Sequence, residues 1–260
     1  KGQDHIQAGD LFQLVLSVRM TAESDLEPFE VYRALRILNP SPYMSFIDLG
    51  DVQIVGSSPE ALVKMDGDLA SLRPIAGTRP RGADEAADLT HERELLADPK
   101  EAAEHVMLVD LARNDLGRIA VPASVRVEPY RTIERYSHVM HIVSGVQAKL
   151  RPDVDAFDVF ASAFPAGTVV GAPKLRAAEI IAELEPEHRG LYAGAVGYFG
   201  HGQTMDQAIA IRTLILSEGQ LSYQAGAGIV ADSVPMREYE ECLHKGAAMK
   251  AALQLAAGGL

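Results

Sequence analysis

The order of strand-like and helix-like segments is the feature that most constrains the fold of this chain. Two runs rich in β-branched and aromatic residues, at 11–20 and 43–49, are separated by a helical pattern that begins at Pro28 and ends at an N-P-S-P sequence. The segment 52–75 contains three further strand-like runs, which predict a meander whose tightest turn is at Gly67. The chain is therefore expected to begin with antiparallel sheet.

The remaining segments mix strands and helices without a strict alternation. Helices are expected at 84–97, 99–113, 153–163, 173–185 and 235–254. Strands are expected at 123–128, 138–150, 193–200, 205–217 and 221–228. Sheets built largely from hairpins, with helices inserted in pairs, predict an α+β fold rather than a doubly wound parallel one. Since no internal repeat or Pro/Ser-rich linker is visible, we expect one domain over residues 1–260.

Composition and charge exclude several classes of function. A chain of 260 residues that is 47% hydrophobic can bury a large core. Its net charge of −12 argues against a nucleic-acid partner, which would need clustered Lys and Arg. The single Cys242 excludes an internal disulfide, and no apolar run approaches the ~18 residues of a membrane-spanning helix. We expect a protein of a reducing, cytoplasmic compartment that binds neither nucleic acid nor membrane.

Two of the expected helices begin with paired carboxylates. Glu101 and Glu104 lie three residues apart and share a helix face, as do Glu238 and Glu241, with Lys245 one turn further on. An acidic first turn is also an ordinary feature of a solvated helix. Hard oxygen donors of this kind suit Mg²⁺, which takes one or two protein carboxylates and keeps waters for a substrate. Glu104 and Glu241 are the expected ligands, with Glu101 and Glu238 holding waters or transferring protons.

Other readings of single motifs fit less well. The spacing Glu241-x-x-His244 occurs in di-iron helix bundles, but that fold needs four core helices, and this chain has many strands. The glycine-rich segment 167–174 lacks the G-K-[S/T] ending of a P-loop, and no second strand with an acidic residue follows 226–231. Both glycine-rich loops can still present backbone N–H groups to an anion such as a carboxylate.

Two further side chains stand out in apolar surroundings. Arg212 is expected inside an apolar strand, where its guanidinium needs an anionic partner from the protein or from a ligand. His141 is placed by strand alternation on the face of Val139 and Val143, which is typical of a hydrogen-bonded core histidine. Neither residue alone identifies a reaction.

Taken together, the motifs resemble those of the chorismate-utilising enzymes over essentially the whole chain. The matching segments occur in the family's order: P-I-A-G-T-R-P-R-G (74–82), A-E-H-V-M-L-V-D-L-A-R-N-D (103–115), S-H-V-M-H-I-V-S (137–144), F-P-A-G-T-V-V-G-A-P-K (164–174) and G-A-G-I-V-A-D-S-V-P-x-x-E-Y-x-E (226–241). Within this family the chain is most similar to the C-terminal catalytic region of anthranilate synthase component I. The resemblance implies a sandwich of largely antiparallel sheets with paired helices outside.

Two positions distinguish members of the family. Isochorismate and salicylate synthases carry a water-activating lysine where this chain has Gln13. Many aminodeoxychorismate synthases carry a nucleophilic lysine where this chain has Ala76. The resemblance therefore implies ammonia as the nucleophile and formation of anthranilate and pyruvate from chorismate, in tryptophan biosynthesis. Aminodeoxychorismate synthase of the folate pathway remains an alternative, because some of these enzymes lack the lysine.

The resemblance also implies roles for individual residues. Mg²⁺ on Glu104 and Glu241 would hold the ring carboxylate of chorismate, with help from the amides of Gly226, Ala227 and Gly228. Tyr192 and Arg212 would hold the enolpyruvyl carboxylate. Glu101 would be the general acid, and His141 would assist the elimination of pyruvate. Further residues expected to line the site are Gly77, Thr78, Thr168 and Lys245.

Regulation and partners are implied by the same resemblance. Relatives begin with an N-terminal segment that we expect to be absent here, and they work with a glutamine amidotransferase subunit that supplies ammonia. Tryptophan would bind between that segment and a wall formed by Pro42, Tyr43 and Met44, so we expect an incomplete regulatory site. The alternative to an enzyme is a truncated, non-catalytic module that binds chorismate.

Overall fold

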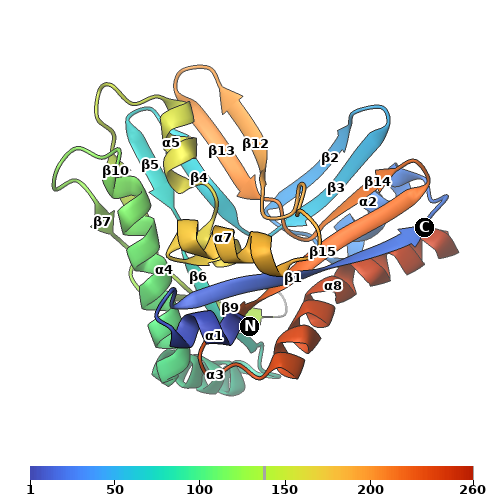
Figure 1. Ribbon diagram of the computed structural model, residues 1–260, viewed down its shortest axis with the longest axis horizontal. Helices are drawn as coiled ribbons and strands as arrows, with labels where there is room; N and C mark the ends of the chain where they lie inside the picture. Colours follow the sequence, from blue (N-terminus) through green and yellow to red (C-terminus); the bar gives the residue numbers. More distant parts are fainter. Residues whose placement is uncertain (137–138, 260) are drawn as a thin grey trace. The chain divides into compact units, whose positions relative to one another are not determined.

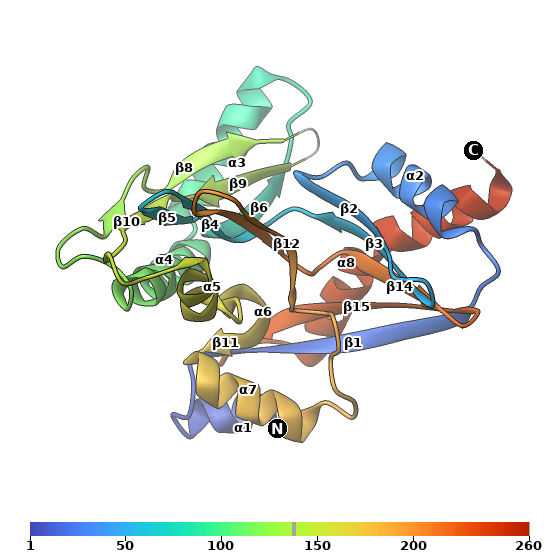
Figure 2. The same ribbon diagram turned by 90° about the horizontal axis from the view of Figure 1, so that it is seen from above.

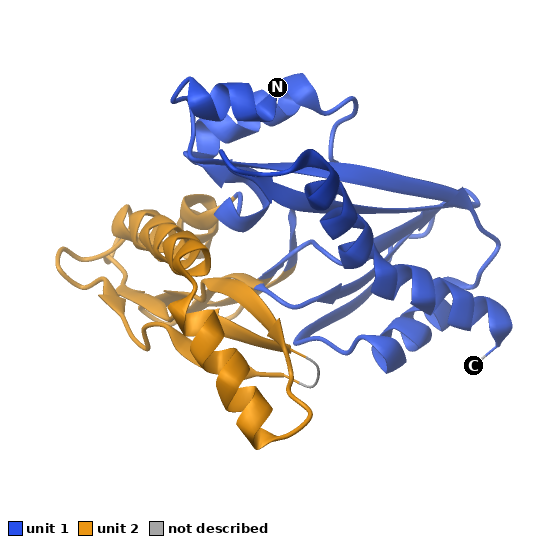
Figure 3. Cartoon of the chain, turned by 90° about the horizontal axis from the view of Figure 1, so that it is seen from below, with its two compact units in different colours: residues 1–60, 165–196, 208–260 blue, residues 61–164, 197–207 orange. Residues whose placement is uncertain are grey.

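The computed structural model describes residues 1–136 and 139–259. The described chain divides into two compact units (Figure 3). Unit 1 comprises residues 1–60, 165–196 and 208–260, and unit 2 comprises residues 61–164 and 197–207. Ser137 and His138, the first residues of one family motif, lie outside the described residues, as does the first residue of the strand expected at 138–150. Mixed helix and antiparallel sheet confirm the predicted α+β class.

Unit 1 is built on an antiparallel sheet whose longest pairing joins strands far apart in sequence. Its strand order is β11 (Gly171–Ala172), β1 (Gln13–Glu23), β15 (Gln220–Ile229), β14 (Thr213–Ser217), β3 (Val52–Ser58) and β2 (Tyr43–Asp48). The β1–β15 ladder runs from Leu14↔Ile229 to Glu23↔Gln220. The strands predicted at 11–20, 43–49 and 221–228 are therefore confirmed, and all three belong to this sheet.

Helices α2 (Pro28–Leu38) and α8 (Pro235–Gly258) lie along one face of this sheet (Figure 1). Both begin with proline at the first helical turn, where a missing N–H costs nothing. Alternate strand residues point toward the helices, and the resulting core contains Val31, Ala34, Leu35, Val55, Leu214, Leu216, Leu221, Met249 and Ala252. The remaining helices of unit 1 are α1 (Gly2–Gln7), α6 (Gly167–Val170) and α7 (Lys174–Leu184).

Unit 2 contains two smaller antiparallel arrangements. The first has the strand order β12 (Ala195–Gly200), β13 (Thr204–Ile209), β4 (Ala61–Asp66), β5 (Leu69–Leu72), β10 (Val146–Lys149) and β7 (Arg126–Val127), where the ends of β12 and β13 extend into unit 1. The second has the order β6 (Ile75–Pro80), β9 (Val139–Val143) and β8 (Thr132–Arg135), with α3 (Glu85–Ala97) packed beside it (Figure 2). The other helices are α4 (Pro99–Gly117) and α5 (Ala156–Ala163).

The structure corrects three strand predictions. The segment 52–75 is not one meander, because β3 pairs with β2 and β14 whereas β4 pairs with β5 in another sheet. Pro59 lies between β3 and β4, and its missing N–H cannot continue a ladder. The run 138–150 forms two strands in different sheets, separated by Ser144 and Gly145, and an added Cβ at Gly145 would lie 2.5 Å from the Glu128 carbonyl oxygen. The run 205–217 is likewise divided, at Arg212.

No helix in the described part of the chain is both long enough and apolar enough to span a membrane.

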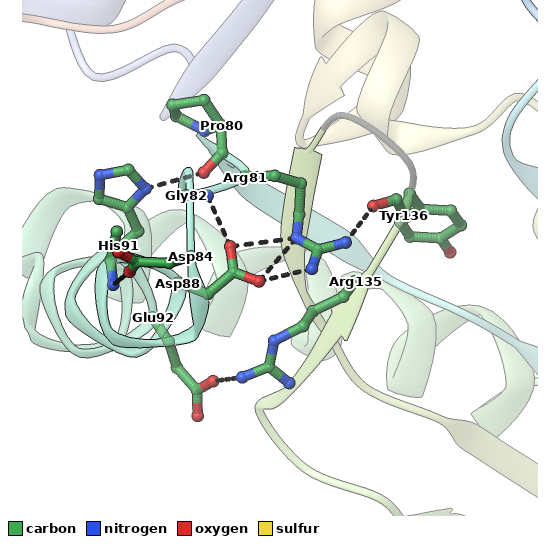
Figure 4. A network of polar contacts seen from close by, with 10 residues as sticks. Pro80, Arg81, Gly82, Asp84, Asp88, His91, Glu92, Arg135 and Tyr136 are labelled. Atoms are coloured by element: carbon green, nitrogen blue, oxygen red, sulfur yellow. Dashed lines mark hydrogen bonds and ion pairs between the residues drawn. The ribbon is translucent and has the colours of Figure 1, made fainter.

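A polar network fastens the turn after β6 to α3 (Figure 4). Arg81 donates to Asp88 through Nε at 2.9 Å and to the Tyr136 carbonyl through Nη1 at 2.8 Å. Asp88 also accepts from the Gly82 N–H at 2.6 Å. The hydrogen bond from Arg81, followed by that from Gly82, lowers the pKa of the Asp88 carboxyl group from 3.8 to about 2. The network therefore depends on an ionised Asp88.

We predict that Asp88→Asn lowers the midpoint of urea unfolding at neutral pH. Because the pKa of Asp88 is lower in the folded state, its stabilisation is present above about pH 4 and is lost as the pH falls through about 2. The difference between wild type and variant should shrink over this window. Asp110→Asn is the control, since Asp110 pairs with Arg113 on an exposed helix face. Equal effects of the two substitutions, independent of pH, would contradict the prediction.

Candidate functional site

The site residues in unit 1 are held together by a set of backbone hydrogen bonds around Glu60. The Glu60 carbonyl accepts from the Ile209 N–H at 3.0 Å. Ala210 donates to the Gly194 carbonyl at 2.9 Å, and Ala193 donates to the Ala210 carbonyl at 3.0 Å. These bonds place the segment that leads to Arg212 in the middle, with Glu60 on one side of it and the segment that carries Tyr192 on the other.

The Glu60 carboxyl group is the most perturbed acid of this cluster. Its Oε1 accepts a hydrogen bond of 3.1 Å from the Thr168 hydroxyl. Desolvation raises the pKa of the carboxyl group from 4.5 to about 7, although the Thr168 hydrogen bond and the charges of Lys245 and Arg212 oppose the shift. Near neutral pH, Glu60 can therefore carry a proton and donate it.

Arg212 lies at a break in the sheet rather than inside a strand, which corrects the sequence prediction. Its φ of +49° is in the left-handed region, and its carbonyl accepts from the Ser57 N–H at 3.0 Å. Burial lowers the pKa of the guanidinium group, and the charge of Glu60 opposes this shift. Glu60 therefore provides part of the anionic partner that was expected for the Arg212 guanidinium.

Lys245 links helix α8 to strand β15. Its ammonium group donates to the Gly226 carbonyl at 3.0 Å and lies 2.7 Å from Glu241 Oε1. The predicted placement of Lys245 one turn beyond Glu241 is confirmed. Glu238 is half-buried in the first turn of α8, on the same side as Glu241.

The glycines of β15 present backbone groups beside Lys245. The β14–β15 pairing ends at Leu214↔Tyr223, whereas β15 continues to Ile229 along β1. Since the Gly226 carbonyl accepts from Lys245, this residue directs its backbone groups away from β1, and the alternation of an antiparallel ladder gives Gly228 the same orientation. Ala227 faces β1, so its predicted role as an anion donor is less favoured than that of the two glycines.

Tyr192 packs against the same strand. A Cβ added at Gly226 would lie 2.6 Å from the Tyr192 hydroxyl, so the glycine makes room for this side chain. Burial raises the pKa of the phenol, which keeps it neutral and able to donate a hydrogen bond. The Arg189 guanidinium lies 5.4 Å from the ring centroid and is itself bound to Glu185, so it supports the ring.

In unit 2 the structure brings His141 to the strand that carries Gly77 and Thr78. His141 Nδ1 lies 2.8 Å from the Gly77 carbonyl oxygen and 3.1 Å from the Thr78 hydroxyl. A carbonyl only accepts, so Nδ1 carries the proton and Nε2 is the basic nitrogen of the neutral ring. Met140 and Ile142 fill the core on the opposite face, which leaves His141 half-buried rather than in the core.

The first turn of helix α4, which carries Glu101, packs against strand β6 at Gly77. Gly77 has a φ of +66°, and a Cβ added there would lie 3.1 Å from Glu101 Oε2. Helix α4 is capped by Asp98, which accepts from the Lys100 and Glu101 N–H groups. Glu101 and Glu104 are both half-buried on this helix. Unit 2 therefore assembles Gly77, Thr78, His141 and Glu101.

The carboxylates of α4 and α8 have the chemistry of a magnesium site. Among the described residues, no group of three or more His, Cys, Asp or Glu side chains is arranged to hold a metal ion. Mg²⁺ needs only one or two protein carboxylates, and Glu104 and Glu241 supply hard oxygen donors on helix surfaces that are not fully buried. Glu104 belongs to unit 2 and Glu241 to unit 1, and their joint binding of Mg²⁺ stays a prediction.

Sequence reasoning missed Glu60. Its signal is weak, because a single acid after Ser58 and Pro59 is neither paired with a second carboxylate nor part of one of the family motifs recognised above. Only the folded chain brings it beside Thr168, Arg212 and Lys245, which sequence motifs did identify.

The predicted regulatory residues lie at the edge of the unit 1 sheet. Tyr43 and Met44 begin β2 and pair with Ser58 and Ser57 of β3, directly after Pro42. Their role in tryptophan binding stays a prediction.

Comparison with known proteins identifies the family. The chorismate binding enzyme family matches residues 1–251. Anthranilate synthase component 1 of Thermus thermophilus is 54% identical over 257 residues, covering 99% of this chain and 56% of the relative. The corresponding protein of Pseudomonas aeruginosa is 55% identical over 254 residues, covering 98% of this chain and 52% of the relative.

Solved structures of related enzymes also align with this chain over nearly its whole length. The crystal structure of anthranilate synthase component I from Streptococcus pneumoniae aligns with a TM-score of 0.89 at 48% identity, covering 95% of this chain and 55% of that chain. The menaquinone-specific isochorismate synthase from Escherichia coli aligns with a TM-score of 0.86 at 26% identity, covering 96% of this chain and 58% of that chain. The chain spans about half the length of the curated relatives it matches. On its fold, its ordered motifs and its match over residues 1–251, the chain belongs to the chorismate binding enzyme family.

Proposed function

We propose that the chain carries out the lyase chemistry of anthranilate synthase, in which chorismate and ammonia yield anthranilate, pyruvate and water. The names of its relatives support this activity, since proteins 53–55% identical to it are anthranilate synthases. The word "component" in those names supports a second subunit, and a glutamine amidotransferase that releases ammonia would fit this role. The arrangement that carries the proposal is the Glu60 carboxyl group, which accepts from the Thr168 hydroxyl at 3.1 Å, lies within the charge influence of Arg212 and Lys245, and has its pKa raised to about 7 by desolvation.

Chorismate needs both cations and a proton donor. It has two carboxylates and a C4 hydroxyl that is a poor leaving group. Arg212, with the hydroxyl of Tyr192, would bind the carboxylate of the enolpyruvyl group, and Lys245 with the Gly226 and Gly228 amides would neutralise the ring carboxylate. Glu60 would then donate a proton to the C4 oxygen as it leaves as water.

The reaction then proceeds in two balanced steps. Ammonia forms a bond to C2 while the ring double bonds shift and the C4–O bond breaks, and the nitrogen loses one proton. In the second step a base removes the C2 proton, the C3–O bond breaks, and pyruvate departs from an aromatic ring as its enolate, which then takes up a proton. His141 Nε2 would be this base, because Nδ1 is held as a donor by the Gly77 carbonyl.

Glu104 and Glu241 would hold Mg²⁺, which supplies charge neutralisation for a substrate carboxylate. The carboxylate chemistry of α4 and α8 supports this assignment. Glu101 is the alternative proton donor, and comparing the Gln variants of Glu60 and Glu101 distinguishes the two assignments.

The buried Ala76 cannot form a covalent intermediate as a lysine would, which favours anthranilate over aminodeoxychorismate as the product.

The first prediction concerns the product. Chorismate, Mg²⁺ and ammonium at mildly alkaline pH should give fluorescent anthranilate and an equal amount of pyruvate. Liquid chromatography with mass detection identifies the product. Isochorismate, salicylate or aminodeoxychorismate as the main product would overturn the assignment, and the absence of turnover would favour a binding module.

The second prediction concerns Glu60. Glu60→Gln should lower kcat by about 10²–10⁴-fold, the usual contribution of a general acid. With free ammonia held constant, wild-type kcat/KM should fall about tenfold per pH unit above pH 7, because the donating form is the protonated one. The variant should lose this dependence. Glu183→Gln, on the exposed surface of α7, is the control. A larger effect of Glu101→Gln, with Glu60→Gln nearly active, would assign the proton to Glu101.

The third prediction concerns the metal. In calorimetry without ammonia, Mg²⁺ should bind weakly alone and more tightly with chorismate, since coupling between ligands is reciprocal. Glu241→Gln should abolish this coupling and leave thermal unfolding nearly unchanged. Glu240→Gln, one exposed residue earlier on α8, should retain it. Tight Mg²⁺ binding that chorismate does not alter would exclude the proposed site.

A further inference from the structure

We propose that Arg79 is a positioning residue that fixes the Glu101 carboxylate against the Gly77 backbone. This inference rests on the proposed function, because that function places Glu101 in the active site. No motif argument assigned a role to Arg79, which lies in the P-I-A-G-T-R-P-R-G segment directly after Thr78.

The Arg79 guanidinium reaches three groups at once. Its Nη2 lies 2.8 Å from Asp98 Oδ2, and its Nη1 lies 3.4 Å from Glu101 Oε1. Nη1 also donates to the Thr78 carbonyl at 2.9 Å. The planar, five-donor guanidinium allows this arrangement, whereas the ammonium of lysine would be a single point of charge.

Asp98 fixes the position of the Arg79 guanidinium relative to helix α4. One of its carboxylate oxygens, Oδ1, caps helix α4 by accepting from the Lys100 N–H at 3.0 Å and the Glu101 N–H at 3.2 Å. The other oxygen binds Arg79. The backbone hydrogen bond from Glu101, with further contributions from Lys100 and Arg79, lowers the pKa of the Asp98 carboxyl group and keeps it an anion. Arg79 is therefore fixed to the same helix turn from which Glu101 projects.

Gly77 forms the opposite boundary for the Glu101 carboxylate. Oε1 faces Arg79, while Oε2 would lie 3.1 Å from a Cβ at position 77. The pairing of β6 with β9 shifts register between Ala76 and Arg79, and this irregularity contains the left-handed Gly77. Such bulges reorient side chains next to functional sites. Here the bulge puts Arg79 and Gly77 on the two oxygens of one carboxylate.

The partial exposure of the Arg79–Glu101 ion pair indicates that it orients the Glu101 carboxylate rather than stabilises the fold. The side chains of Arg79 and Glu101 are 27% and 23% exposed, and the contact is long for an ion pair. Ion pairs with this much solvent contribute little to folding. A displacement of about 1 Å within an active site, however, can lower the rate about a hundredfold.

A double-mutant cycle tests the inference. Arg79→Gln should lower kcat for anthranilate formation about 10- to 100-fold with little change in KM for chorismate. In the Glu101→Gln background the same substitution should have almost no further effect, because Arg79 acts through Glu101. Arg79→Lys should recover part of the activity. Arg135→Gln is the control, since Arg135 also joins a strand to a helix of unit 2, through Glu92, and should leave kcat unchanged. Independent, multiplying effects of Arg79→Gln and Glu101→Gln would overturn the proposal.

Crystal structures of the variants provide a readout that does not depend on turnover. In Arg79→Gln the Glu101 carboxylate should move away from Gly77, while in Arg135→Gln it should stay. An unmoved Glu101 would refute the positioning role even if the enzyme is active. If wild type makes no product from chorismate, the proposed function fails, and the position of Glu101 still decides the role of Arg79.

Discussion

The desolvated carboxyl group of Glu60, held beside two cations, is the interaction on which the proposed chemistry depends. An acid next to Arg212 and Lys245 would ordinarily be ionised, because opposite charges favour the charged form. Desolvation exceeds their effect and holds the pKa of Glu60 at about 7. The cluster can therefore attract an anion and still supply a proton. If Glu60 were more exposed, its pKa would fall and it would be ionised at neutral pH. Without Arg212 and Lys245, the cluster would no longer attract a substrate carboxylate.

The side chains of both units are placed by departures from regular strand geometry. Arg212 and Ala193 adopt left-handed conformations and are held by backbone hydrogen bonds to Ser57 and Ala210, respectively. Gly77 adopts the same conformation within the bulge of β6, where it faces His141 and Glu101. Such conformations cost energy for residues with a side chain and persist where the surroundings enforce them. The regular sheets supply these surroundings, since β1 and β15 pair continuously from Leu14↔Ile229 to Glu23↔Gln220.

Much of the fold follows from local signals in the sequence. Pro28 and Pro235 mark helix starts, Gly67 marks a turn, and the α+β class follows from the order of segments. The division of 138–150 and 205–217 was not predicted, because strand-like residues continue on both sides of Gly145 and Arg212 while the chain passes from one sheet to another. Three site residues did stand out in the sequence, namely Arg212 by its charge in an apolar run, His141 within a family motif and Lys245 by its helix spacing from Glu241. Glu60 was missed because its pKa depends on Thr168 and on burial, and both come from segments distant in sequence.

The most direct test of the account is a crystal structure of the Glu60→Gln variant with chorismate and Mg²⁺. The slow variant should retain intact substrate long enough for its position to be determined. The account predicts that the C4 oxygen lies within hydrogen-bonding distance of the side chain at position 60, with the enolpyruvyl carboxylate on Arg212. Chorismate bound with its C4 oxygen remote from position 60, or with neither carboxylate on Arg212 or Lys245, would contradict the central claim.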